Sequence, residues 1–236
     1  MAAYIFGAPP RWGKTMSATR WALKRLADNA RRRKKNPKFV GEVFSNYPIY
    51  SKKYGYTKVL EGDFEQWPIF DSLIIVDEAH RRYNSRKYKD FPDWMHDFFA
   101  WCGQRGNDII LISHDPGRID KVAREMVEVF YFTYKISILG FPILFIIEGY
   151  LKEDDYRKRQ FRYSREFYLF SRKVSKSYDT HHFRNQPETL PHYPDWGEKM
   201  GMSVPGVPIS RQIIESTTTE PQPEEPRQEQ QEDLLD

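Results

Sequence analysis

The chain has 236 residues, a net charge of +4 and 16% aromatic residues, which is enough apolar material for one sizeable folded domain. Its single cysteine, Cys102, excludes an internal disulfide, and its N-terminus has no feature typical of a signal peptide. The longest apolar run, residues 136–147, is interrupted by Gly140 and Pro142 and is too short to cross a bilayer.

Charge is distributed unevenly along the chain. Residues 213–236 contain eight acidic residues and one basic residue, a net charge of −7, which leaves +11 on residues 1–212. We predict one domain over residues 1–183 and a flexible, largely disordered tail over 184–236, where the composition becomes polar and proline-bearing. A basic body suits nucleic acid or an anionic membrane surface, although a solvated surface with a mild charge bias explains it equally well.

In chain order, apolar patterning predicts strands over 2–7, 38–48, 72–80 and 107–114, and helices over 16–35 and 91–102. Strands that are apolar throughout and that alternate with helices favour a parallel sheet covered on both faces. The runs 128–139, 141–150 and 162–174 are expected to be antiparallel strands, the first two joined by a turn at 140–142. The predicted fold class is therefore α/β, with a mainly parallel sheet and antiparallel strands added after it.

The stretch "GAPPRWGKT", residues 7–15, is close to a phosphate-binding loop, but Ala8 stands where the first glycine is usual. Such a loop needs backbone N–H groups at a helix N-terminus, a lysine for the outer phosphates and a hydroxyl for magnesium. Its position between a predicted strand and a predicted helix favours a nucleotide site over a fortuitous turn. The predicted nucleotide-binding residues are Ala8, Pro9, Pro10, Arg11, Trp12, Gly13, Lys14, Thr15 and Met16.

A second motif, "LIIVDEAH", places Asp77 and Glu78 at the end of an apolar strand. In P-loop ATPases an aspartate at this place holds Mg²⁺ indirectly, and a following glutamate can polarise the attacking water. Thr15 and Asp77 are therefore the predicted magnesium residues. The chain has no guanine-reading Asn-Lys-x-Asp motif, so ATP is the expected nucleotide.

Three further stretches follow in order: "VFSNYPI" (43–49), "IIVDEAHRRYNSR" (74–86) and "GQRGNDIILISHDPGRIDKVAREMVEVFY" (103–131). With "REFYLFSRKVSKSYDTHHF" (165–183), their order and spacing resemble the zonula occludens toxin (Zot) family over residues 3–183. That family includes the gene I morphogenesis proteins of filamentous phages and is related to the FtsK and HerA DNA-pumping ATPases.

The resemblance implies that Lys14 binds phosphate and that Glu78 is the catalytic base. His114 stands where the family has a glutamine, so it is either a sensor of the γ-phosphate or only a polar residue at a strand end. Gln104, Arg105 and Gly106 replace the family's His-Arg-His-like element. Family members usually carry a membrane-spanning helix after the ATPase domain, and this chain shows none.

Motors of this class are oligomeric rings in which an arginine of one subunit completes the neighbour's site. Arg105 is the preferred candidate, with Arg86 and Arg118 as alternatives, and each of them taken alone could be a surface arginine. The run "RRRKK", residues 31–35, is either a solvated helix end or a contact to DNA or anionic lipid. His181 and His182 have no further ligands at a metal-binding spacing.

The expected function is that of a viral ATPase which hydrolyses ATP to power virion assembly or extrusion. One alternative is a genome-packaging ATPase that translocates DNA, and the other is an adaptor that binds nucleotide without hydrolysing it. The expected places are the host cytoplasm, the periphery of the host membrane or the virion. A membrane role would need a membrane or capsid partner protein, since no spanning helix is evident.

Overall fold

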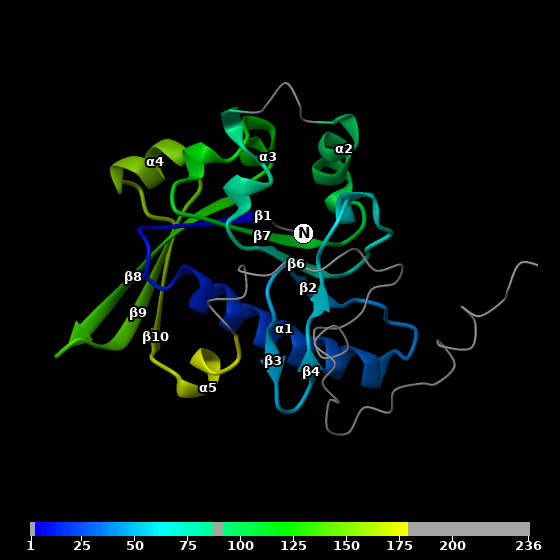
Figure 1. Cartoon of the computed structure of the whole chain (residues 1–236), viewed down its shortest axis with the longest axis horizontal. Helices are drawn as coiled ribbons and strands as arrows, with labels where there is room; N and C mark the ends of the chain where they lie inside the picture. Colours follow the sequence, from blue (N-terminus) through cyan, green and yellow to red (C-terminus); the bar gives the residue numbers. More distant parts are fainter. Residues whose placement is uncertain (1–2, 87–91, 179–236) are drawn as a thin grey trace, which may run out of the picture. The chain divides into compact units, whose positions relative to one another are not determined.

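The computed structural model describes residues 3–86 and 92–178. They form an eight-stranded sheet in the order β10-β9-β8-β1-β7-β6-β2-β5 (Figure 1). Its strands are β1 (Ala3–Gly7), β2 (Val43–Ser45), β5 (Lys58–Val59), β6 (Leu73–Val76), β7 (Asp108–Ser113), β8 (Val129–Ile138), β9 (Phe141–Tyr150) and β10 (Ser164–Leu169). A separate two-stranded sheet pairs β3 (Tyr50–Ser51) with β4 (Gly55–Tyr56).

Six neighbouring strands, from β8 to β5, are parallel, whereas β9 and β10 are antiparallel additions next to β8. The parallel strands begin at one edge of the sheet, here called the amino edge, and end at the other, the carboxyl edge. Loops that follow the strands therefore meet at the carboxyl edge, which is the usual place for a ligand in such sheets.

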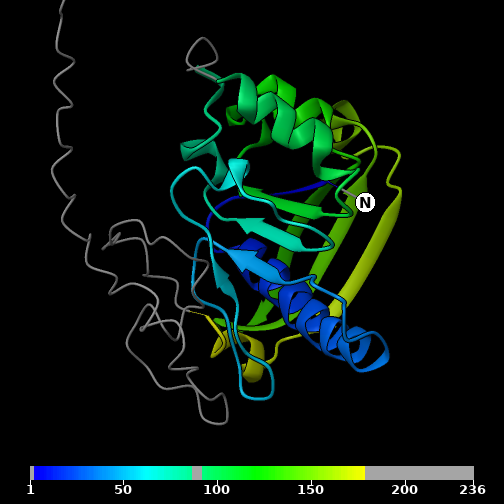
Figure 2. The same cartoon turned by 90° about the vertical axis from the view of Figure 1, so that its right-hand side faces the viewer.

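Helices cover both faces of the sheet (Figure 2). On one face, α1 (Lys14–Lys35) packs through Met16, Ala22 and Leu26 against strand residues such as Phe6 and Ile110. On the other face, Met95, Phe98 and Phe99 of α2 (Asp93–Cys102) join Ile5 and Ile109 in a second core cluster. Consecutive strand residues thus serve opposite cores, which explains why these strands are apolar throughout.

Short helices complete the fold. α3 (Lys121–Glu125) and α4 (Glu153–Lys158) contribute to the same core as α2, and α5 (Arg172–Ser175) contributes Val174 to the core on the α1 face. Three 3₁₀ turns, η1 (Phe64–Gln66), η2 (Ala79–Arg81) and η4 (Pro116–Arg118), lie in the loops.

The predicted fold class is confirmed, and so is the hairpin formed by β8 and β9. Three details differ. The run 38–48 holds only the short strand β2, β8 pairs parallel with β1 as well as antiparallel with β9, and the run 162–174 ends in α5. The predicted tail and both histidines at 181 and 182 lie outside the described residues. Among those described, no helix has the length and apolar character needed to cross a membrane.

Candidate nucleotide-binding site

The loop between β1 and α1 lies at the carboxyl edge of the sheet. Gly13 has a φ of 93°, and a Cβ atom there would lie 2.5 Å from Phe145 of β9, so both backbone conformation and space require glycine. Ala8 is buried and is not among the described residues with positive φ, so a methyl group is tolerated there. The substitution at the first glycine position therefore does not disturb the loop.

Lys14 is folded back onto its own loop. Its Nζ donates to the carbonyl oxygens of Ala8 at 2.6 Å and Pro9 at 3.0 Å, and to Nδ1 of His114 at 3.1 Å. Burial lowers the pKa of Lys14, whereas the negative charges of Asp77 and Glu78 act in the opposite direction. The ammonium group is thus held at the mouth of the loop by acceptors that a phosphate could replace.

Thr15 and Asp77 meet directly, although they lie 62 positions apart in the chain. Thr15 Oγ1 donates to Asp77 Oδ2 at 2.9 Å. Burial raises the pKa of Asp77 from its ordinary value of 3.8 to about 6, against the effect of hydrogen bonds from Thr15 and the Glu78 N–H. A hydroxyl and a carboxylate of this kind are oxygen groups that could hold Mg²⁺ together with phosphate and water.

Asn46, which follows β2, holds the backbone of Asp77 in place. Its Oδ1 accepts from Asp77 N at 2.8 Å, and its Nδ2 donates to Asp77 O at 2.9 Å. These two bonds fix the peptide groups on either side of the Asp77 side chain. Asn46 therefore positions the carboxylate without touching it.

Glu78 follows with a left-handed backbone, φ 52° and ψ 40°, which is uncommon for a residue with a side chain. Its carboxylate lies between two imidazoles, with Oε1 3.3 Å from His114 Nε2 and Oε2 3.4 Å from His80 Nδ1. Ser113 Oγ lies 3.3 Å from the same nitrogen of His80. Strain at such a position is typical of a functional residue that the surrounding structure holds in place.

His114 connects Lys14 to Glu78. Because an ammonium group can only donate, His114 Nδ1 must be the acceptor, so the proton resides on Nε2 and is donated to Glu78. Burial lowers the pKa of His114, an effect that the charge of Lys14 increases and that of Glu78 opposes. The structure thus contains a continuous chain from the lysine ammonium through a neutral imidazole to the carboxylate.

The predicted site residues fall into two groups. Gly13, Lys14, Thr15 and the cluster around Asp77 come together, whereas Met16 is buried in the core under α1, which leaves only its backbone facing the loop. Pro9, Pro10 and Arg11 are exposed on the loop, and Trp12 packs against Phe132 with ring centroids 5.8 Å apart.

The structure does not bring Arg105 to this cluster. It precedes β7 and therefore lies at the amino edge, where its Nη1 donates to the Trp67 carbonyl at 3.1 Å and its guanidinium lies 5.4 Å from the Trp101 ring. Arg86 is an exposed residue that follows η2. Arg118 is the candidate nearest to the cluster, since its charge contributes to the lowered pKa of His114.

Sequence reasoning did not assign roles to Asn46 and His80. Each follows the end of a parallel strand, which is the same signal that pointed to Asp77, and both lie within stretches that carried the family resemblance. Among the described residues no cluster of three or more His, Cys, Asp or Glu side chains could hold a metal ion alone.

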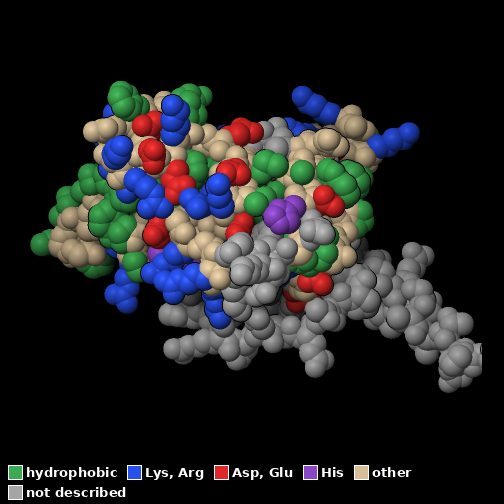
Figure 3. Space-filling view, turned by 90° about the horizontal axis from the view of Figure 1, so that it is seen from above, with side chains coloured by type: hydrophobic (Ala, Val, Ile, Leu, Met, Phe, Trp, Pro, Cys, Tyr) green, Lys and Arg blue, Asp and Glu red, His purple; other side chains and the backbone are tan. Residues whose placement is uncertain are grey.

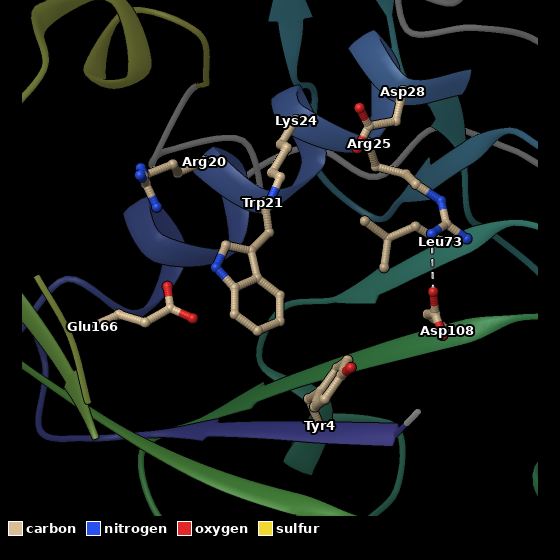
Figure 4. A pocket seen from close by; sticks show the side chains of 9 residues that line it. All are labelled: Tyr4, Arg20, Trp21, Lys24, Arg25, Asp28, Leu73, Asp108 and Glu166. Atoms are coloured by element: carbon tan, nitrogen blue, oxygen red, sulfur yellow. Dashed lines mark ion pairs between the residues drawn. The ribbon is translucent and has the colours of Figure 1, made fainter. Parts of the chain in front are cut away.

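A pocket of about 600 Å³ lies away from this site, between α1 and the amino edge (Figure 4). Its charged residues are balanced in sign, and Arg25 forms an ion pair with Asp108 at 3.0 Å across it. Its lining residues are Tyr4, Arg20, Trp21, Lys24, Arg25, Asp28, Leu73, Asp108 and Glu166.

Residues 51–163 match the family model described as zonular occludens toxin (Zot). Over these residues the chain is similar to the Zot family. The matched range includes Asp77, Glu78 and His114 and excludes the phosphate loop, so it is narrower than the resemblance over residues 3–183.

The N-terminal domain of zonular occludens toxin from Neisseria meningitidis has a similar structure, with a TM-score of 0.51 and 16% identity over 75% of this chain and 98% of that one. The genome packaging NTPase B204 from Sulfolobus turreted icosahedral virus 2, in complex with ATP-gammaS, gives a TM-score of 0.40 and 9% identity over 62% and 90% of the two chains. The DNA-packaging ATPase B204 from Sulfolobus turreted icosahedral virus gives 0.42 and 12% identity over 62% and 91%. No curated protein matches this chain.

Proposed function

We propose that this chain is a viral ATPase of the Zot type that hydrolyses ATP to power virion assembly or extrusion. The observation that carries the proposal is the pairing of Thr15 with Asp77 beside the chain from Lys14 through His114 to Glu78. Lys14, Thr15, Asp77 and Glu78 are residue types that P-loop ATPases use for phosphoryl transfer to water.

In this proposal Lys14 leaves the carbonyls of Ala8 and Pro9 and donates to the outer phosphates of ATP. Loss of the Lys14 contact frees Nδ1 of His114, whose other nitrogen still donates to Glu78. His114 thereby links the binding of ATP in the loop to Glu78, the carboxylate that takes the proton of the attacking water. Asn46 keeps Asp77 turned toward Thr15, and Mg²⁺ bound to these two residues would neutralise charge on the phosphates.

An arginine from a neighbouring copy would complete the site. Arg118 lies at the carboxyl edge near His114 of its own chain, so it could act within one subunit or on a neighbour's site, whereas Arg105 could act only across a subunit contact that brings a neighbour's amino edge to this site. Mixing Arg118→Ala with Lys14→Ala subunits separates the two roles, since each mutant subunit then lacks a different half of the site. Recovery of turnover in the mixture supports an arginine acting in trans.

Genome packaging is the second candidate, and the net charge of +11 on residues 1–212 favours it. Release of phosphate from ATP with Mg²⁺ should be measured with DNA, without DNA and with lipid vesicles. Stimulation by DNA favours packaging, and stimulation by vesicles favours assembly at a membrane. No release under any of these conditions, together with saturable ATP binding, would favour the adaptor.

A further inference from the structure

The β8–β9 hairpin extends past the body of the sheet. β1 pairs only with residues Val129 to Phe132 of β8, and β10 pairs with β9 only as far as Leu144. Within residues 3–86 and 92–178, no strand pairs with the last rungs of the hairpin, Ile138 with Phe141 and Ser137 with Pro142. Figure 1 shows this end projecting away from the helices.

The projecting end is apolar and exposed to solvent. We call Ile136, Ile138, Leu139, Phe141 and Ile143 the hairpin tip. Leu139 is 92% exposed, Phe141 76% and Ile138 58%. Figure 3 shows hydrophobic side chains gathered at the end of the molecule where Figure 1 places this hairpin. Contiguous exposed apolar side chains of this kind usually mark an interaction surface.

The turn at the apex indicates that the leucine does not serve folding. Leu139 and Gly140 have φ values of 50° and 82°, so both central residues are left-handed, the conformation that favours Asn-Gly in two-residue hairpins. Leucine is disfavoured in that conformation and gains almost no burial here. Leu139 is therefore unfavourable both in its backbone conformation and in its exposure to water. Such a residue is expected where a binding partner buries the side chain.

The charges around the hairpin tip have one sign. Residues 134–147 contain Lys135 as their only charged residue, and residues 167–177 contain Arg172, Lys173 and Lys176 with no acidic residue. The two segments lie side by side, since Phe170 N donates to Ile143 O at 2.8 Å. Within these two segments every charged residue is therefore a cation.

We propose that the hairpin tip inserts into the headgroup region of an anionic lipid bilayer. Insertion of about 5–10 Å would bury the apex. Lys135 lies four residues from Leu139, roughly 13 Å along the strand, which places its ammonium group among the lipid phosphates. The inserted backbone is paired within the hairpin, as a bilayer requires. A protein partner is less suitable, because the tip offers almost no polar side chains for the rim of a protein interface.

This surface would allow the chain to bind a membrane directly, without a spanning helix or a membrane partner, and it does not depend on ATP hydrolysis. The experiment is co-sedimentation of the full chain with vesicles of phosphatidylcholine alone or mixed with phosphatidylglycerol. The protein should pellet with the anionic vesicles. Leu139→Asn should weaken that binding by at least about 10-fold, because the leucine contributes the most exposed apolar side chain.

Leu139→Asn should not lower the melting temperature, since asparagine suits the turn, so lost binding cannot be ascribed to misfolding. Phe161→Asn is the matched control: Phe161 is 83% exposed, has a φ of 49°, and lies outside the hairpin. It should leave vesicle binding unchanged. Replacing Lys135 and Lys173 by Gln should weaken binding to anionic vesicles by about 5-fold for each charge.

Failure of the wild-type chain to bind either kind of vesicle would overturn the proposal, as would an equal loss in Phe161→Asn. A change in oligomeric state caused by Leu139→Asn, without vesicle binding by the wild type, would instead make the hairpin tip a contact between copies of this chain.

Discussion

The two edges of the parallel sheet use the same side chains for different purposes. At the amino edge, Asn107 accepts from Ser72 N at 3.0 Å and donates to Ile69 O at 2.8 Å. At the carboxyl edge, Asn46 makes the same two kinds of bond, but to the backbone of Asp77. The amino-edge amide ties loops together, whereas the carboxyl-edge amide positions an acid.

The charged groups differ in the same way. At the amino edge Arg105 donates to a backbone carbonyl and Arg25 pairs with Asp108. At the carboxyl edge Lys14, Glu78 and His114 satisfy one another across partly buried contacts, with lowered pKa values for Lys14 and His114 and a left-handed backbone at Glu78. Matching polar composition therefore does not identify a site, but mutual pairing with strain and shifted pKa values does.

The largest expected effect is loss of nucleotide binding in Lys14→Ala, which removes the cation at the mouth of the loop. Calorimetric titration of the protein with ATP in the presence of Mg²⁺ should show saturable binding for the wild type and none for the variant. Arg25→Ala at the amino edge is the control and should bind ATP as the wild type does. Equal ATP affinity in Lys14→Ala and wild type would show that the loop only imitates a phosphate site.

The next effect separates binding from turnover. Glu78→Gln keeps the shape of the side chain but cannot take a proton, so it should bind ATP and hydrolyse it about 10²–10⁴-fold more slowly. Single-turnover phosphate release measures the rate independently of product dissociation. A variant with the wild-type rate would place the general base elsewhere in the cluster.

Asn46→Ala tests the comparison of the two amides directly. Loss of a residue that orients a metal ligand typically costs 10–100-fold, so Mg²⁺-dependent turnover should fall by about that factor. The Mg²⁺ concentration for half-maximal rate should rise as well, which a purely structural role would not produce. Asn107→Ala removes the same two kinds of bond and should lower the melting temperature without changing the Mg²⁺ dependence.

The sequence predicted the parts of the site that short spacings define. The loop from Ala8 to Thr15 and the pair Asp77–Glu78 were predicted because each forms a motif of a few consecutive residues. Asn46 was missed because its contact with Asp77 depends on β2 lying beside β6, which the sequence does not state. His80 was missed although it lies only two residues after Glu78, because the sequence does not show which way its imidazole turns. The preference for Arg105 was based on a glycine-flanked loop, and a loop sequence does not show at which edge of a sheet it lies.

The β8–β9 hairpin was predicted as two strands, but its exposure was not. The apolar sequence of a strand does not show whether another layer of the fold covers the strand or whether it is exposed to solvent. Only the register shows that the rungs beyond Phe132 have lost β1 as a neighbour. The same pattern therefore marked both the buried strands and the exposed hairpin tip.

The pH dependence of stability provides a smaller effect. Asp77 has a folded-state pKa of about 6 against an ordinary 3.8, so the nucleotide-free protein binds the extra proton when folded. Its stabilising contribution is present below pH 3.8 and is lost as the pH rises through about 6, a change on the order of 3 kcal/mol. The difference in melting temperature between wild type and Asp77→Asn should follow this window. A difference in melting temperature that does not vary between pH 4 and 7 would contradict a buried Asp77 carboxyl group with a raised pKa.

The smallest effect concerns the basic end of α1, which lies toward the amino edge. Arg33 already pairs with Glu42 at 2.6 Å and Arg31 with Asp28 at 2.9 Å, so part of the run 31–35 serves the protein itself. If this end contacts DNA, the slope of log affinity against log salt should flatten by at most about 0.9 for each cation removed. Lys34→Gln and Lys35→Gln should show this flattening more clearly than Arg33→Gln, whose guanidinium is already neutralised.

Deleting residues 213–236, with their net charge of −7, should tighten DNA binding because they compete for the same basic surface. DNA affinity that is absent or independent of salt in all these variants would leave the amino edge without a nucleic-acid role and would favour extrusion over packaging.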